Sequence, residues 1–188
     1  DTAGARALGA SGLSDLSIDG MAFQGHPERD HTPTSDRTQA VRFEKCSRVS
    51  VTACEFDTFL VACLALSRDG SITWVQGGDP NTQESVDANL ARNSEDAWVA
   101  DCKFLNCDGF GFACFGVTRL TVKDCIHTVS QNVTNPTDIG FRIDDMSGSY
   151  GVQDFSVSDE VYVQNWRTLG GGGQIRLTGV GRAQVKGC

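Results

Sequence analysis

The sequence predicts an all-β fold, a right-handed parallel β-helix (solenoid) of about seven coils. A frame of an apolar residue, any residue and a second apolar residue recurs along the chain, with its last members 23 to 35 positions apart. Apolar residues at helical spacing are absent, and so are the regularly placed leucines of leucine-rich repeats. The frame occurs at residues 16–18, 49–51, 72–74, 97–99, 120–122, 155–157 and 183–185.

Each repeat contains two short strands joined by a turn. The repeats that align without a gap are 40–54, 111–125 and 174–188. In the first of them Val41 and Phe43 alternate with polar residues, and Val49 and Val51 do so after the turn. Strict alternation places one face of each strand in a core and the other in water.

Stacking the coils in register turns the sequence into columns of equivalent residues. One inward column holds Met21, Cys54, Gly77, Cys102, Cys125, Glu160 and Cys188. A second column, two places further on, holds Phe23, Phe56, Asp79, Phe104, His127 and Tyr162. Small buried thiols suit the first column, and stacked aromatic rings suit the second.

The cysteines are expected to be free thiols. Seven of the eight fall at predicted core positions, including Cys63 in a column with Phe43, whereas Cys107 falls in a turn. A disulfide is the weaker alternative, because parallel Cβ vectors would hold the Cβ atoms of Cys102 and Cys125 too far apart. No CxxC pair supports a zinc site. Free core thiols predict folding in a reducing cytoplasm.

Charged residues precede the second strand of most repeats. Their column holds Asp15, Arg48, Ser71, Asp96, Arg119, Asp154 and Arg182. Neighbours in this column lie about one strand spacing apart, so the alternating charges predict an ion-pair ladder that fixes the register of the coils. Asp101, Asp124 and Asp159 form another column, in a turn where short polar side chains tolerate left-handed backbone geometry.

Departures from the repeat mark the candidate site. Most of the variation in length falls between the aromatic column and the next first strand, and loops on a rigid scaffold are where binding and chemistry usually reside. We expect three long segments to wall a groove at one corner. These segments are 128–138, 144–154 and 163–173.

Carboxylates near an outward arginine give this region its candidate chemistry. The candidate catalytic residues are Asp138, Arg142, Asp144 and Asp145. Two carboxylates about 5–10 Å apart could cleave a glycosidic bond, and a base beside a uronate could serve a lyase. The same carboxylates could bind Ca²⁺, or be ordinary turn residues paired to Arg142.

Substrate binding is assigned to Arg176, Trp98 and Trp166. Arg176 shares its outward position on the first strand with Arg42 and Arg142. Trp98 points outward and Trp166 lies in a long loop, so both rings could stack on sugars. For Trp98, a contact with another subunit explains the outward position as well as stacking on a sugar does.

Composition excludes several classes of function. The chain has 188 residues and a net charge of −8, which disfavours binding to nucleic acid or to an anionic membrane. No apolar run is long enough to span a membrane, and no signal peptide begins the sequence. His26, His31 and His127 provide no spaced ligand set, so neither a metal nor a cofactor is expected.

A single domain, residues 1–188, accounts for the whole chain. Residues 13–23 already belong to a coil, and Cys188 stops inside one. Neither a capping helix nor a polar terminal coil is evident, although the open ends of a β-helix need cover. We therefore expect a segment of a longer β-helix, or a chain capped by partners.

Four phrases of the sequence resemble the pectin-lyase-like right-handed β-helix superfamily. They are LSIDG, VSVTACEF, WVADCKF and LTVKDC. The superfamily includes polysaccharide lyases, polygalacturonase-type hydrolases and phage tailspikes. The chain lacks the Asn-Thr-Asp and Gly-His-Gly motifs of polygalacturonases and the Arg-x-Pro-x-x-Arg motif of pectate lyases. Those two activities are therefore not implied. The free cysteines and the missing signal peptide favour the tailspike branch of the superfamily, whose trimers bind and often cleave surface polysaccharide.

Two function hypotheses follow. The first is a carbohydrate-recognising β-helix of a phage tailspike or related polysaccharide depolymerase, with hydrolase or lyase activity left open. The second is a non-catalytic structural or adhesion protein, such as a virion decoration or fibre protein. Both imply a virion or extracellular location. The expected partners are a polysaccharide, identical subunits in a homo-oligomer such as a trimer, or other virion proteins.

Overall fold

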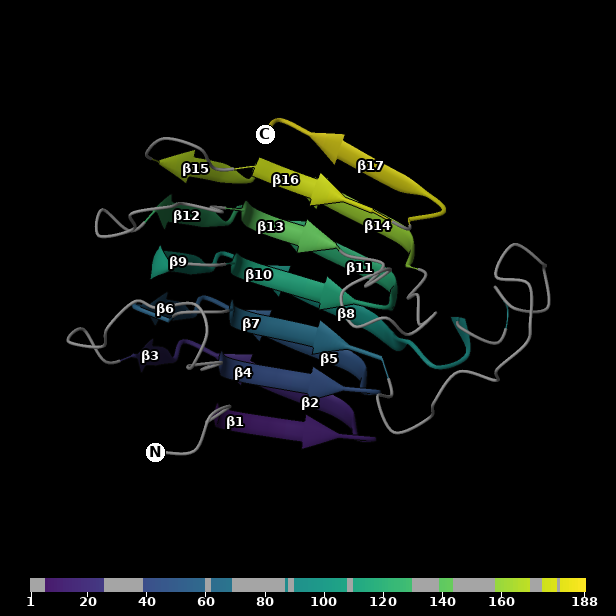
Figure 1. Cartoon of the computed structure of the whole chain (residues 1–188). Helices are drawn as coiled ribbons and strands as arrows, with labels where there is room; N and C mark the ends of the chain where they lie inside the picture. The colour runs from purple at the N-terminus through teal and green to yellow at the C-terminus, as the bar shows by residue number, and fades with distance from the viewer. Residues whose placement is uncertain are drawn as a thin grey trace, which may run out of the picture.

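A computed structural model gives the architecture of the chain. It describes residues 6–25, 39–59, 62–68, 87, 90–107, 110–129, 139–143, 158–169, 174–178 and 180–188. The elements labelled in Figure 1 are all β-strands, and they form three sheets in which every pairing is parallel. The predicted all-β class with parallel strands is therefore confirmed.

The strands belong to three separate sheets. The first sheet contains β1 (Arg6–Ser11), β4 (Gln39–Glu44), β7 (Ala62–Ser67), β10 (Phe110–Phe115), β13 (Ile139–Ile143) and β16 (Gln174–Leu177). The second contains β2 (Ser14–Asp19), β5 (Ser47–Thr52), β8 (Ser94–Ala100), β11 (Val117–Lys123), β14 (Asp159–Gln164) and β17 (Ala183–Lys186). The third contains β3 (Ala22–Gln24), β6 (Glu55–Asp57), β9 (Lys103–Cys107), β12 (Ile126–Val129) and β15 (Arg167–Leu169).

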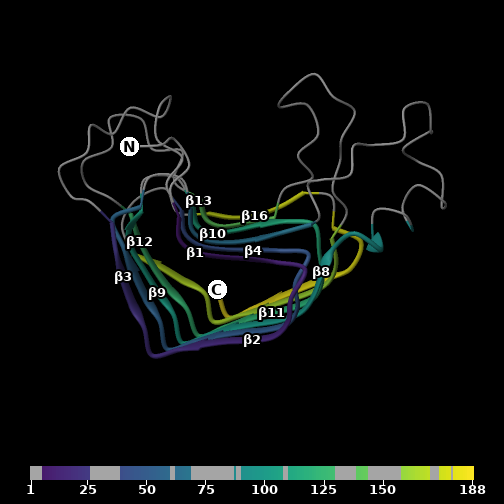
Figure 2. The ribbon, with the colours of Figure 1, turned by 90° about the horizontal axis from the view of Figure 1, so that it is seen from below.

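The chain visits the three sheets in turn. β4, β5 and β6 follow one another along the chain, and each belongs to a different sheet. β7 then returns to the first sheet and pairs with β4. Figure 2 shows the strands of each sheet one behind another. Residues at equivalent places in successive passes therefore lie side by side.

Strand pairing confirms five of the seven predicted frames, and the other two, 72–74 and 155–157, lie outside the described residues. β5 pairs directly with β8. β14 meets β11 through Val161 and Val163, the place predicted for residues 155–157. The second sheet therefore has six strands, where the seven frames predict seven. Apolar alternation alone does not separate a strand of the second sheet from a segment between its strands.

The predicted aromatic column is confirmed over four passes. Phe23, Phe56, Phe104 and His127 lie in register on the third sheet. The ring centroids of Phe23 and Phe56 are 5.1 Å apart, and those of Phe56 and Phe104 are 5.3 Å apart. Tyr162 does not continue this column, because it lies on β14 of the second sheet.

The predicted cysteine column is confirmed for Cys54, Cys102 and Cys125, which are buried and free. Trp166 occupies the next place, which had been predicted for Glu160, since Arg167 pairs with Ile126. Cys188, also predicted for the core, is exposed. The core cluster includes side chains from all three sheets, so burial of apolar surface holds the sheets together.

Non-glycine residues with positive φ occupy both ends of the second-sheet strands. Asp101 and Asp124 have φ values of 55° and 52° in the turn after β8 and β11, which confirms their predicted geometry. Asn165, with a φ of 54°, takes the place predicted for Asp159. Its Nδ2 donates to Asp124 Oδ1 at 2.7 Å, and this hydrogen bond lowers the pKa of Asp124. Adjacent passes are thus linked at the turn.

The predicted ion-pair ladder is present at the other end of these strands. Arg48 binds Asp15 at 2.6 Å, and Arg119 binds Asp96 at 2.5 Å. Arg182 binds Glu160 at 2.6 Å, so Glu160 replaces Asp154 in the ladder. Ser71 and Asp154 lie outside the described residues. Hydrogen bonding to the arginine lowers the pKa of Asp15 and of Asp96.

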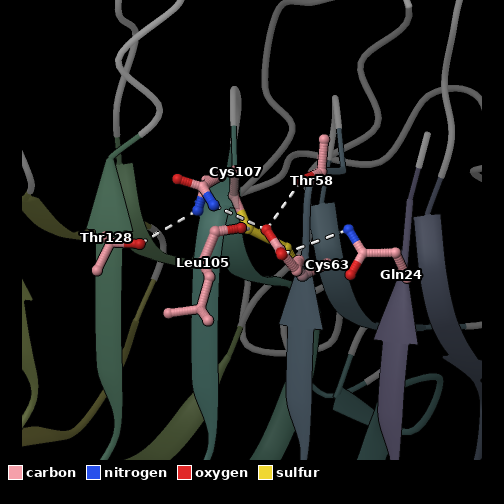
Figure 3. The surroundings of a disulfide bond; sticks show 8 residues. Gln24, Thr58, Cys63, Leu105, Cys107 and Thr128 are labelled. Carbon is pink, nitrogen blue, oxygen red and sulfur yellow. Dashed lines mark hydrogen bonds between the residues drawn. A yellow bond between two sulfur atoms is a disulfide. The ribbon is translucent and has the colours of Figure 1, made fainter. Parts of the chain in front are cut away.

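A disulfide joins Cys63 of β7 to Cys107 at the end of β9 (Figure 3). Both cysteines are fully buried. This corrects the expectation of a free thiol at Cys63 and a turn position for Cys107. Leu66, not Cys63, lies beside Phe43. The two cysteines come from different sheets, so the objection to a bond between stacked neighbours does not apply to them.

His127 is the one titratable side chain of the confirmed aromatic column. It is fully buried, and within the described part of the chain neither ring nitrogen has a hydrogen-bond partner. The ring centroid lies 6.5 Å from that of Trp166. Burial lowers the pKa of His127 to about 4, because charging the imidazole here would leave a cation without compensation.

The disulfide is expected to stabilise the fold. Closing a loop between residues 44 positions apart removes chain entropy from the unfolded state, and the double variant Cys63→Ser/Cys107→Ser should lose about 4 kcal/mol in denaturant unfolding. Thiol titration of the unreduced, denatured chain should find six free thiols. Cys188→Ser is the control and should unfold like the wild type. Eight titratable thiols in the unreduced chain would contradict the assignment.

His127 should make the fold sensitive to acid. Its folded pKa is depressed, so the stabilising contribution is complete above the unfolded pKa of about 6.5 and is lost as the pH falls towards about 4. Over that interval the unfolding free energy attributable to His127 should decrease by about 3 kcal/mol. His127→Phe should remove this component in urea titrations at pH 7 and pH 4.5. Equal pH dependence in both proteins would refute the assignment.

Candidate functional site

The predicted carboxylates Asp138, Asp144 and Asp145 lie outside the described residues. The five-residue strand β13 separates the two segments that carry them. A strand of this length rises about 16 Å. The segment before β13 and the segment after it therefore attach to opposite ends of the first sheet.

The three long segments attach at two corners, which corrects the prediction of a single corner. The connection from β12 to β13 runs between the third and first sheets, and the connection from β13 to β14 runs between the first and second sheets. Much of 163–173 is strand, since it includes the end of β14 and all of β15. One groove walled by all three segments does not follow from this topology.

The predicted arginine column is confirmed in the backbone register of the first sheet. Arg42, Arg142 and Arg176 share one row, with Ala65 and Ala113 between them. The Arg42 guanidinium lies 3.4 Å from Glu44, and Nε donates to Ser67 Oγ at 3.3 Å. Arg176 is exposed, whereas the Arg142 side chain lies outside the described residues. Arg42 is thus held by an ion pair and a hydrogen bond to other residues of the first sheet.

Trp166 cannot bind a substrate, because only 2% of it is exposed. Its ring stacks on Phe104, with centroids 5.5 Å apart. The prediction placed it in a long loop. The chain instead turns at Asn165 and enters β15 at Arg167, which directs the indole into the core. This prediction is therefore wrong.

Trp98 lies on the outer face of the second sheet and is 43% exposed. Its neighbours on either side in the same row are Ser50 of β5 and Thr121 of β11. The complete outward row consists of Ser17, Ser50, Trp98, Thr121, Tyr162 and Gln184. This face therefore combines aromatic rings with hydroxyl and amide groups, and we take it as the candidate site.

Tyr162 is the site residue that sequence analysis missed. It lies between Val161 and Val163 of β14, as Thr121 lies between Leu120 and Val122 of β11. The Tyr162 hydroxyl donates to Gln164 Oε1 at 2.9 Å, and Lys186 Nζ lies 6.0 Å from the ring centroid. The alternation at 161–163 was the signal that could have placed this ring on the outer face.

The ion-pair ladder borders this face and neutralises its arginines. Arg119 contacts Glu95 at 2.7 Å in addition to Asp96. Hydrogen bonding to Asp96 raises the pKa of Arg119, so the guanidinium stays charged. At the other border Lys123 lies 3.4 Å from Asp124. The edges of the face thus carry matched charges.

A polar network at the end of the third sheet is the other cluster near long connections (Figure 3). The Asp57 carboxylate accepts hydrogen bonds from Gln24 at 3.3 Å, Thr58 at 2.8 Å and Asn106 at 2.9 Å. Asn106 also donates its backbone N–H to Thr128 Oγ1 at 3.1 Å. These bonds link four passes, so the network joins strand ends.

The described residues contain no group of three or more His, Cys, Asp or Glu side chains placed to hold a metal ion. They also include no helix with the length and apolar character needed to cross a membrane. Comparison with models of protein families, with curated protein sequences and with solved structures finds no match to this chain. Function is therefore argued from the residues of the chain itself.

Proposed function

We propose that this chain is a carbohydrate-recognising right-handed parallel β-helix that binds a surface polysaccharide on the outer face of its second sheet. Three parallel sheets, visited in turn by each pass and sharing one core, support this closed solenoid. The right-handed connection is the general rule for parallel strands. The resemblance to pectin-lyase-like proteins agrees with this architecture.

The observation that carries the proposal is the exposed indole of Trp98 between two hydroxyl-bearing residues. A pyranose ring has an apolar C–H face and a rim of hydroxyl groups. An aromatic side chain offers the matching apolar surface, and neighbouring hydroxyls supply hydrogen bonds. Ser50 and Thr121 stand one strand spacing from Trp98, about 4.8 Å.

The proposed biological setting is that of a tailspike or a related depolymerase. Such a protein acts outside a cell or on a virion, where the Cys63–Cys107 disulfide would persist. Folding in a reducing cytoplasm is proposed from the five buried free thiols, although the disulfide itself favours an oxidising compartment. A homo-oligomer such as a trimer is proposed by analogy with tailspikes.

A structural or adhesion role is the second candidate function. The exposure of Trp98 favours it as well, since tryptophan is enriched at protein–protein interfaces. In that case the outer face of the second sheet would contact another subunit, and no sugar would bind there.

Polysaccharide binding should depend on Trp98. Trp98→Ala should weaken retention on a panel of immobilised bacterial surface polysaccharides by about tenfold or more, because the stacking surface is lost. Affinity electrophoresis measures this directly. Leu169→Ala is the matched control, since Leu169 is 57% exposed on the third sheet.

Two results would count against the proposal. Equal retention of Trp98→Ala and wild type would place binding elsewhere. A lack of retention on every polysaccharide, together with a smaller sedimenting species for Trp98→Ala, would favour the structural role.

Cleavage is tested separately from binding. If Asp144 is the catalytic carboxylate, the wild type should release reducing ends from a retained polysaccharide, and Asp144→Asn should release at least about a hundredfold less. Asp144→Asn should still be retained like the wild type. Equal release by both proteins would show that Asp144 is not the catalytic carboxylate. If no member of the panel releases reducing ends, the chain binds polysaccharide without cleaving it.

A further inference from the structure

From Ser50 onward, beyond Ser17, the outward row of the second sheet alternates between polar and aromatic side chains. Along the stack the order is Ser50, Trp98, Thr121, Tyr162 and Gln184. Adjacent members belong to paired strands and lie about 4.8 Å apart. Trp98 and Tyr162 are therefore separated by about 10 Å, with Thr121 between them.

Resting on the proposed function, we propose that this row binds an uncharged, extended, 1,4-linked glycan with diequatorial linkages, which runs along the stack and across the strands. In such a chain the advance per pyranose is similar to the spacing between strands, which is about 4.8 Å. Each sugar is also turned over relative to the next. Every second sugar consequently presents the same C–H face to the protein. The distance between such sugars matches the distance between Trp98 and Tyr162, about 10 Å.

The position of each side chain assigns its role. Trp98 stacks on one sugar, Thr121 hydrogen-bonds the next, and Tyr162 contacts the third. Ser50 and Gln184 extend the row by one sugar at each end. The hydrogen bond to Gln164 and the contact with Lys186 hold the Tyr162 ring in place, which reduces the entropy lost on binding.

Charge favours an uncharged glycan over a polyanion. Arg48, Arg119 and Arg182 at the border of the row are each bound to carboxylates at 2.5–2.7 Å. A uronate chain would have to compete with these ion pairs. The net charge of −8 also repels polyanions.

Geometry excludes strongly curved glycans. A chain that follows the row must stay straight over five strands of the second sheet, because the row itself follows the strand pairing. An α-1,4-linked glucan curves away from a flat surface within a few residues. It could contact Trp98 or Tyr162, but not both at equivalent sugars.

The test compares defined oligosaccharides by titration calorimetry on the whole chain. Cello- and chito-oligosaccharides of two to six sugars are the probes, with malto-oligosaccharides and polygalacturonate as comparisons. Affinity for at least one of the two β-linked series should rise about tenfold from the dimer to the trimer, since the third sugar reaches Tyr162, and level off near the pentamer. Tyr162→Ala should reduce trimer affinity to the dimer value. Trp98→Ala should weaken every length, and Leu169→Ala should change none.

The outcomes separate this inference from the proposed function. Preference for malto-oligosaccharides or polygalacturonate, or a trimer affinity unchanged in Tyr162→Ala, overturns the extended-glycan inference. If a polysaccharide is still retained through Trp98, the proposed function stands. If no β-linked probe binds and Trp98→Ala dissociates an oligomer, both fail and the face is a protein interface.

Discussion

In-register stacking of parallel strands is the constraint on which the rest of this structure depends. Each pass of the chain lies about 4.8 Å from the next, so a residue is covered by its equivalent in the neighbouring pass. The core is built accordingly, with Phe56 over Phe104 and Cys102 over Cys125. The same rule acts on the outside, where charges must alternate. Arg48 and Arg119 each lie beside an acidic neighbour.

Positive φ values at the corners make this stacking possible. Asp96 and Arg119 both adopt a left-handed backbone at the start of the second-sheet strands. The repeated kink brings their side chains to the same edge, where they pair. Glu160 adopts it as well and joins the ladder. The left-handed residue repeated at each corner therefore places the paired side chains of the ladder along one edge of the outer face.

Features that depend on neighbours in the repeat can be predicted from the sequence, whereas features that depend on the chain length between repeats cannot. The alternation at Val49 and Val51, the phenylalanine column and the ladder were all predictable, because a two-residue period fixes the face of each side chain. The place predicted for residues 155–157 belongs to β14, because apolar alternation occurs at both segments. Choosing the earlier segment hid Tyr162 from the candidate site and placed Trp166 in a loop. The Cys63–Cys107 bond was out of reach because it joins different sheets.

The disulfide also has a mechanical consequence. Because each pass contacts mainly the next, a force that pulls the two ends apart would peel passes away singly from the outside. Peeling would stop on reaching Cys63 or Cys107, since the covalent bond then bears the load. The chain between them, which spans 44 positions, could not extend until the bond was reduced. The passes between Cys63 and Cys107 would thus resist extension as one unit, and the second-sheet row crosses them through Trp98 of β8.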